Sequence, residues 1–363
     1  MSLLSIETKH IIHKGFKQVQ NPFFFYMKEK NSFSLKGKLT PMGVAFYITP
    51  FINAIVRSGT QQEKQLVFES MLSWKAFDEL PSTKRGHAFG ATEKRVEQAV
   101  RVATNVKARQ TKIQNSMVEQ LEGMVETQDL LKHKVLLFLL EPGEVDKNIT
   151  GLIANKFMAK FQRPVAMLTH RNDLYQGSAR GCDIVGITDF KGICEDSGYV
   201  EATIGHPGAF GLTIKTDNIE AYLSATDEIL KEMSNEPIYY VDYIWEADTV
   251  NPEAILTIAS LENLFGKDFN EPLVAIKNLK VTPEMVAVYD KKSLTIKFSL
   301  PNGISIMKFN ATEEEVNKFK DNNTGYVQVD LVCKSNANDW LGEVTPQLFI
   351  EGYEIIDSNK YFF

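Results

Sequence analysis

A helical pattern from Thr92 to Glu126 constrains the fold of this chain more than any other feature. Apolar residues recur there at steps of three and four, the spacing of one face of an α-helix. A helix of that length is roughly 50 Å long. Its apolar face is narrow, which is typical of a connector between lobes, so we expect separately folded parts on either side. Thr92 is expected to cap it. The apolar positions are Val96, Ala99, Val100, Ala103, Val106, Ile113, Met117, Leu121 and Met124.

The composition is that of a globular protein of two or three domains. The chain has 363 residues, of which 44% are hydrophobic and 24% charged. The longest apolar run, residues 135–140, is too short to span a bilayer, and we see no secretory signal. Cys182, Cys194 and Cys333 lack CxxC spacing, which argues against a zinc site or a disulfide framework. They fit a reducing compartment, so we expect a cytoplasmic protein with no membrane partner.

Charge is unevenly distributed along the chain. Residues 1–118 hold 18 basic and 8 acidic residues, a net of +10, whereas the remainder holds 22 and 38, a net of −16. A basic N-terminal third predicts a surface that faces a polyanion, although a merely solvated basic face remains an alternative. Five cations on the long helix could contribute to such a surface: Lys94, Arg101, Lys107, Arg109 and Lys112.

The chain after the long helix alternates strands and helices and then becomes rich in strands. Buried strands are expected at 134–140 and 163–170, with a helix between them, and further strands at 173–180 and 210–215. A helix over 216–233 is expected to begin with a capping box of Asp217 and Glu220. Five strand segments with one helical insert at 312–319 suit a small barrel of the oligonucleotide-binding type. The segments are 272–281, 285–300, 304–310, 325–335 and 346–356.

Two short stretches carry candidate chemistry. In "YQGSARG", Ser178 offers a hydroxyl and Arg180 a planar fork that matches a phosphate. In "GHPGA", Gly205 and Gly208 favour a turn whose backbone N–H groups can bind an anion, and His206 can donate a proton or a hydrogen bond. A structural role for a histidine among glycines remains the alternative. Both stretches lie at strand ends, so Arg180 and His206 could meet at one phosphate.

These stretches, in this order, resemble the DHH-associated domain of the DHH phosphoesterase superfamily. Other segments narrow the resemblance to RecJ-like exonucleases specific for single-stranded DNA, and together they cover nearly the whole chain. They are "GVAFYITPFINAIVRSG" (43–59), "ATNVKARQTKIQ" (103–114), "ITGLIANKFMAKFQRPVAML" (149–168), "LENLFGKDFNEPLV" (261–274) and "NDWLGEVTPQLFIEGYE" (338–354).

The resemblance implies a mixed α/β fold in four parts. Residues 1–90 would be the C-terminal remnant of a DHH domain, 91–130 the connecting helix, 131–260 the small α/β DHH-associated domain and 261–363 an all-β barrel of the oligonucleotide-binding type. The chain departs from the family pattern at Ile204, Phe210 and Gly181. These changes are expected to narrow the pocket or weaken phosphate contact.

The family's metal-binding motifs are absent from this sequence. It holds no Asp-x-Asp and no Asp-His-His, and His10 and His13 have no aspartate near them, so we reject them as a metal site. The Mn²⁺ or Mg²⁺ of the family would need ligands outside this chain. We therefore expect the C-terminal portion of a longer enzyme, inactive alone. The alternative is a non-catalytic scaffold that binds DNA or protein. A DHH-type phosphodiesterase acting on short oligonucleotides or signalling dinucleotides is a third, weaker reading.

The resemblance also implies roles for individual residues. Ser178 and Arg180 would hold a DNA phosphate, and His206, with the Gly205 and Gly208 backbone, would orient the scissile one as the catalytic group of this part. Arg57 would line the path of the strand. The intact enzyme would degrade single-stranded DNA from the 5′ end in DNA repair or recombination. Residues 251–363 hold 11 basic and 16 acidic residues, so a protein partner of an acidic barrel is a further possibility.

Overall fold

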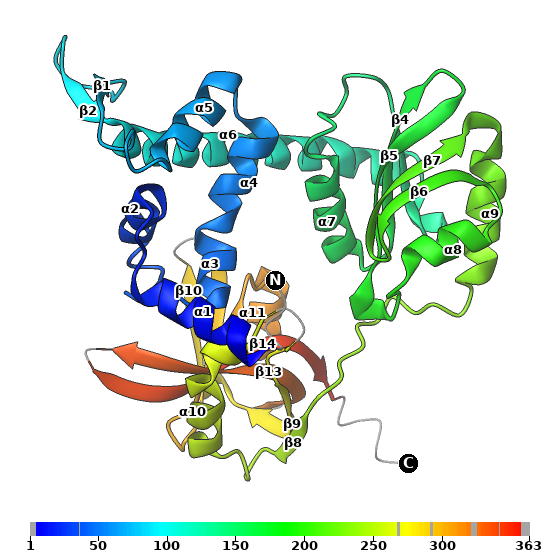
Figure 1. The fold of residues 1–363 in the computed structure, drawn as a ribbon. Coiled ribbons are helices and arrows are strands. Elements are labelled where there is room, and N and C mark those ends of the chain that lie inside the picture. The colour runs from blue at the N-terminus through cyan, green and yellow to red at the C-terminus, as the bar shows by residue number, and fades with distance from the viewer. Residues whose placement is uncertain are drawn as a thin grey trace, which may run out of the picture. The chain divides into compact units, whose positions relative to one another are not determined.

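The computed structural model describes residues 5–35, 37–266, 269–290, 293–320, 325–340 and 342–356. The chain forms two compact units (Figure 1). The first comprises residues 19–37 and 45–238, and the second residues 1–18, 38–44 and 239–363. Within the described ranges, no helix is both long and apolar enough to cross a membrane.

The expected connector is α6, Arg95–Thr127, the longest helix of the first unit. Its N-terminal half carries three shorter helices: α2 (Pro22–Lys30), α4 (Thr49–Ser58) and α5 (Gln61–Ser70) (Figure 1). One hydrophobic core joins them, and its fully buried members include Phe23, Met27, Ala54, Val96, Ala99, Ala103 and Val106. The apolar stripe that predicted the helix is therefore the stripe that packs. Helix α3 (Pro41–Tyr47) precedes α4, and the division between the two units falls within it.

The predicted cap of α6 is wrong. Thr92 lies in β2 (Thr92–Lys94), which pairs antiparallel with β1 (Glu79–Pro81). The N-cap is Lys94, whose side chain makes no capping bond. Backbone carbonyls replace a side chain, since the N–H of Arg95 donates to Asp78 O at 2.9 Å and that of Val96 to Ala76 O at 2.9 Å. These two bonds satisfy N–H groups that a helix otherwise leaves open.

A five-stranded sheet forms the other end of the first unit. Its order is β3-β4-β5-β7-β6; the β3–β4 pair is parallel and the other pairs are antiparallel. Helix α7 (Thr150–Phe161) packs on one face, against β4 and β5, and α8 (Phe190–Asp196) and α9 (Ile219–Ile229) line the other (Figure 1). The strands are β3 (Leu136–Leu140), β4 (Val165–Arg171), β5 (Leu174–Arg180), β6 (Val200–His206) and β7 (Ala209–Lys215).

The four strands predicted here are confirmed, as is the helix between the first two. Strand β6 was not predicted, although Val200, Ala202 and Ile204 alternate with Glu201 and Thr203 in the sequence; in the structure none of its residues is buried. The capping box of Asp217 and Glu220 is wrong. Asp217 lies in a 3-10 turn (Thr216–Asn218), and α9 begins after Asn218, which makes no side-chain capping bond.

The second unit is built on a seven-stranded sheet of order β10-β11-β12-β14-β13-β9-β8. Strands from along the whole sheet share one core with α10 (Pro252–Ser260) and α11 (Glu313–Lys320). Thr312 and Glu315 form the capping box of the predicted insert helix. Helix α1 (Ile6–Lys17) belongs to this unit too, with Lys9 Nζ 4.9 Å from the Phe269 ring centroid. The strands are β8 (Tyr243–Glu246), β9 (Leu273–Val281), β10 (Val286–Asp290), β11 (Leu294–Ser299), β12 (Ser305–Phe309), β13 (Val327–Trp340) and β14 (Glu343–Ile355).

The unit boundaries differ from the four expected parts. Strand β8 pairs with β9 and α10 packs on the same core, so this unit begins at Tyr239 and not at residue 261. Residues 1–18 and 38–44 group with it, although we expected residues 1–90 to stay together. The segment 285–300, expected as one strand region, is the antiparallel pair β10–β11.

Candidate nucleic-acid interface

Register places three of the predicted site residues, Ser178, Arg180 and His206, on one face of the five-stranded sheet. Arg180 of β5 pairs with Ala209 of β7, and Ala209 pairs with His206 of β6. Directly paired residues of antiparallel strands project from the same face. The next row on this face is Ser178, Gly211 and Ile204. Small residues therefore separate Arg180 from His206, and no bulky side chain rises between them.

This face is covered at one end and open at the other. Helix α7 packs over β4 and β5, whereas Ala209, His206 and Ile204 on β7 and β6 are exposed. The opposite face is closed by α8 and α9 around Ala179 and Phe210. The open part of this face, formed by Ala209, His206 and Ile204, lies beside the N-terminal half of α7 and is accessible to an extended chain. We call this surface the shelf.

The N-terminal turn of α7 holds Arg180. Its Nη1 donates to Ala179 O at 2.6 Å, and its guanidinium lies over Gly151, where a Cβ would come within 2.2 Å of Nη2. The arginine is half-buried. Burial lowers the pKa of Arg180, and the positive charge of Arg57 lowers it further. A guanidinium still stays charged at neutral pH, so the protein keeps a partly desolvated cation here.

Ser178 is tied to the same turn. Its Oγ lies 3.0 Å from Thr150 Oγ1, and the Thr150 hydroxyl donates to Lys147 O at 3.1 Å. A hydroxyl has one hydrogen, so Ser178 is the donor in its bond to Thr150. In this arrangement Ser178 positions α7, and it would have to turn away from Thr150 to donate to a phosphate.

Four cations of α4, α6, α7 and β5 form two neighbouring pairs, Arg57 with Arg180 and Lys107 with Lys156. Arg57 adds to the field at Arg180. Burial lowers the pKa of Lys107, and the charge of Lys156 lowers it further. Among the described residues none of the four forms an ion pair with a carboxylate. By contrast, two other cations of α6 are neutralised, since Arg101 pairs with Glu93 and Arg109 with Glu63.

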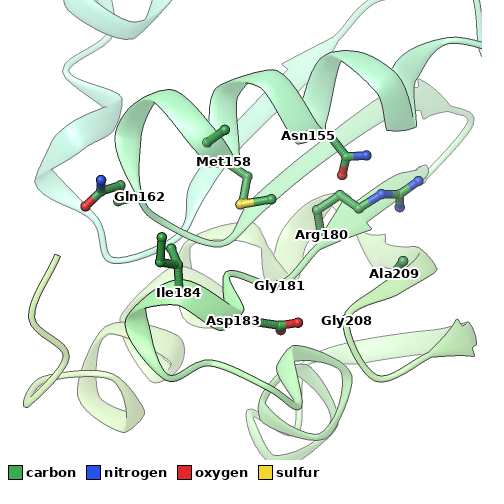
Figure 2. A pocket seen from close by; sticks show the side chains of 10 residues that line it. Asn155, Met158, Gln162, Arg180, Gly181, Asp183, Ile184, Gly208 and Ala209 are labelled. Atoms are coloured by element: carbon green, nitrogen blue, oxygen red, sulfur yellow. The ribbon is translucent and has the colours of Figure 1, made fainter. Parts of the chain in front are cut away.

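A pocket of about 440 Å³ opens between α7 and the end of β5 (Figure 2). Arg180 is on its wall, and Asp183 and Gly208 lie on the other side. Asp183 makes this pocket less favourable for an anion than the shelf. The remaining lining residues are Asn155, Met158, Ala159, Gln162, Gly181, Ile184 and Ala209.

The structure unites only some of the predicted site residues. Arg57, Arg180 and Ser178 gather at α7, and Gly208 joins Arg180 at the pocket. His206 and Gly205 end β6, two strands away, roughly 10 Å at the usual strand spacing. Because the Arg180 guanidinium is folded over Gly151, the two side chains do not converge on one point, contrary to our expectation.

The reason for a glycine differs between the four positions Gly177, Gly181, Gly205 and Gly208. A Cβ at Gly177 would lie 1.9 Å from Met167 O, so this glycine allows β4 and β5 to pair. Gly205 has φ +139°, and a Cβ there would lie 2.8 Å from Ala209 O. Gly181, a departure from the family pattern, packs against Phe190. A Cβ at Gly181 would lie 3.1 Å from the Cβ of Phe190. Gly208 has no such need, since its nearest neighbour, Asp183, is 3.7 Å away.

Three residues of the candidate interface were not predicted from the sequence: Thr150, Gly151 and Lys156. Gly151 left a signal, since a glycine in the first turn of a helix is unfavourable without a packing reason. Thr150 and Lys156 look like ordinary helix residues in the sequence. In the described part of the chain, no three His, Cys, Asp or Glu side chains lie together as a metal site would require. These residues therefore do not fit a Mn²⁺ or Mg²⁺ centre.

Comparisons with known proteins agree with the motifs. Residues 241–352 match the family model for the RecJ OB domain. Over 362 residues the chain is 30% identical to the prophage-derived single-strand DNA-specific exonuclease YorK of Bacillus subtilis (strain 168), covering 98% of this chain and 62% of that protein. It is 24% identical to the single-stranded-DNA-specific exonuclease RecJ of the same organism over 251 residues, which is 66% of this chain and 30% of RecJ.

The fold agrees as well. The structure of RecJ from Thermus thermophilus in complex with Mn²⁺ superposes with a TM-score of 0.63 at 14% identity, over 93% of this chain and 45% of that one. A second structure of that protein, with Mg²⁺, gives 0.61. Residues 241–352 therefore match a RecJ OB domain, and nearly the whole chain is similar in sequence to a single-strand DNA-specific exonuclease and in fold to RecJ. The resemblance to RecJ-like single-strand-specific exonucleases and the expected mixed α/β fold are thereby confirmed. The chain spans 62% of the length of YorK.

Proposed function

We propose that this chain is the C-terminal, nucleic-acid-binding part of a RecJ-like exonuclease that degrades single-stranded DNA from the 5′ end. The observation that carries the proposal is Arg180, held over Gly151 beside the open face of the sheet, with two pairs of like charges, Arg57 with Arg180 and Lys107 with Lys156, that have no carboxylate partner in the described chain. Like charges held together repel each other. A phosphate backbone laid across them would remove that repulsion and release counterions.

The shelf beside α7 suits a single strand better than a duplex. Arg180 and Arg57 would hold phosphates, and the small residues Ala209 and Gly211 would let the backbone lie close to the sheet. His206, exposed at the end of β6, would contact the neighbouring phosphate and orient it for cleavage. The N–H groups next to Gly205 and Gly208 would support it. Ser178 would act mainly by fixing α7 beneath Arg180.

The chemistry of cleavage would come from outside this chain. In the longer protein Mn²⁺ or Mg²⁺ would activate water and neutralise the leaving oxygen, and a role in DNA repair or recombination would follow. The described residues of this chain do not fit those ions, so they would bind and orient the strand.

A protein-binding role of the second unit is a second candidate. No arginine occurs in residues 181–363, although arginine is the residue best suited to phosphates. An acidic barrel without arginine would favour a basic protein surface over DNA. The scaffold alternative extends this idea to the whole chain.

The test is fluorescence anisotropy with a 5′-phosphorylated single strand and the same strand in duplex, each at two salt concentrations. We expect preference for the single strand and a steep loss of affinity with salt. Absence of binding at low salt would contradict the proposal. A nuclease assay with Mn²⁺ tests separately whether cleavage requires metal ligands from outside this chain. A clean preparation of this chain should not degrade DNA, and robust digestion would refute that requirement.

A further inference from the structure

The hairpin at the N-terminal end of α6 carries two turns in series. In Lys84–His87 the His87 N–H donates to Lys84 O at 3.2 Å, and Gly86, the third residue, has φ +87°. In Ala88–Ala91 the Ala91 N–H donates to Ala88 O at 3.1 Å, and Gly90 has φ +80°. A positive φ at the third position alone is the pattern of a type II turn, which requires glycine there.

The two turns present Arg85 and Phe89 at equivalent second positions. Both side chains are exposed, and Phe89 is fully exposed. Lys84 is exposed beside them. In the described part of the chain, neither Lys84 nor Arg85 pairs with a carboxylate. Of the nearby acids, Asp78 pairs with Arg95 and Glu93 with Arg101, and Glu79 lies at the base of the hairpin, directly opposite Lys94. The tip is therefore an uncompensated positive charge around one aromatic ring.

The base of the hairpin is fixed to α6. Buried Glu93 accepts hydrogen bonds from Thr83 N at 3.0 Å, from Gln98 Nε2 at 2.9 Å and from Arg101. The loop closes where Ser82 N donates to Ala91 O at 2.8 Å. In a loop that is not anchored, an exposed aromatic side chain would fold back onto the nearest apolar surface. This loop is anchored at its base, and its own turns hold the ring away from the body.

We propose that this tip, formed by Lys84, Arg85 and Phe89, is a second contact for single-stranded nucleic acid. Phe89 would stack on a base, and Arg85 with Lys84 would hold the flanking phosphates, the combination by which proteins bind single strands without sequence preference. The inference rests on the proposed function, because it requires that the chain bind single strands.

The distance along α6 sets the length of strand that can reach both sites. Helix α6 begins at Arg95, and Gln114 contacts α7 through a 3.2 Å bond to Leu152 O. That interval corresponds to roughly 28 Å. At about 3.4 Å per stacked nucleotide, a strand needs roughly 8 nucleotides to span it. The tip lies beyond Arg95, so the span is longer than this interval. A six-nucleotide ligand that stays stacked covers only about 20 Å and falls short of it, whereas a twenty-nucleotide ligand can bridge the α7 site and the tip.

The experiment measures binding of labelled oligothymidylates of 6 and 20 nucleotides by anisotropy. Phe89→Ala and Arg85→Ala should each weaken the 20-mer roughly 5- to 100-fold and leave the 6-mer unchanged. Phe33→Ala is the matched control, because Phe33 is another almost fully exposed phenylalanine of the same unit. It should leave both ligands unchanged. A Phe89→Trp variant should bind the 20-mer normally and lose more tryptophan emission on binding than wild type, in which Trp74, Trp245 and Trp340 set the background.

The outcomes separate this proposal from the previous one. If Arg180→Ala weakens both ligands while the tip variants change neither, the α7 site stands and the tip proposal is overturned. An unquenched Phe89→Trp variant that binds the 20-mer would also overturn it, and would favour a protein partner for the ring. If wild-type protein binds neither oligonucleotide, both proposals fail together.

Discussion

The Arg180 guanidinium occupies the space that a side chain at Gly151 would need. A Cβ on Gly151 would lie 2.2 Å from Nη2 and 3.1 Å from Cζ of Arg180. Gly151 is buried in the first turn of α7, and its φ is not positive. The α7 backbone would therefore accept alanine, and the glycine is required by the arginine alone.

Gly151→Ala should separate binding from folding. The added methyl would push away the end of a flexible side chain, and alanine is about 1 kcal/mol better than glycine inside a helix. We expect a thermal midpoint close to that of wild type and clearly weaker binding of single strands. Gly123→Ala is the control, because Gly123 lies in α6 with no atom near its Cβ position. Equal binding by both variants would show that Arg180 does not need its present position.

Arg180→Ala should weaken single-strand binding by about 1–3 kcal/mol, the scale for a charge-assisted contact. Loss of one phosphate contact should also reduce the slope of log affinity against log salt by about 1. Arg171→Ala is the matched control: Arg171 ends β4 of the same sheet and is exposed. Titrations at four salt concentrations measure both quantities. An affinity loss shared by Arg171→Ala would indicate a diffuse charge effect and not a site.

The three thiols should resist alkylation in the native protein. All three cysteines are free and buried. Burial raises the pKa of Cys194 to about 12, despite a hydrogen bond with Tyr222, and it also raises the pKa of Cys182 and Cys333. Since the thiolate is the reactive form, treatment at pH 8 should leave all three unmodified until denaturant is added. Mass spectrometry of intact protein measures this. Rapid labelling of one cysteine without denaturant would mean that its part of the core opens.

The sequence predicted elements best where a pattern had one cause. The stripe from Val96 to Val106 became the core side of α6, and the apolar run at 136–140 became β3. Predictions failed where backbone from elsewhere did the work of a side chain. The start of α6 is the clearest case, because carbonyls of Asp78 and Ala76 replace the cap expected from Thr92.

The candidate site could be proposed from residue types, but its geometry could not be predicted. Arg180 and Arg57 were singled out, and they do lie close enough to influence each other. The separation of Arg180 from His206 was not predictable. It depends on β7 lying between β5 and β6, and on the space at Gly151 that lets the Arg180 guanidinium lie against α7. The spacing of Ser178, Arg180 and His206 in the sequence shows neither the strand order nor the packing of Arg180 against Gly151.

Acid should loosen the hairpin that carries Phe89. Burial raises the pKa of Glu93, but hydrogen bonds from Gln98 and Thr83 and the charge of Arg101 outweigh it, so the pKa is lowered overall from 4.5. A carboxylate with a lowered pKa stabilises the folded state fully above its ordinary pKa, and this contribution is lost as pH falls through the lowered value. Wild-type protein should therefore lose this anchor only below about pH 4.5.

Glu93→Gln tests that anchor directly. The amide keeps the size and one acceptor oxygen but loses the charge that faces Arg101, at a cost of about 1–3 kcal/mol. Above pH 6 the variant should unfold at lower temperature, and the gap to wild type should close toward pH 3. Hydrogen exchange at the Thr83 and Ser82 amides should speed up in the variant at neutral pH, since Glu93 accepts from the first and the second makes the bond that closes the loop. Parallel pH profiles of the two proteins would mean that the Glu93 charge does not hold the hairpin.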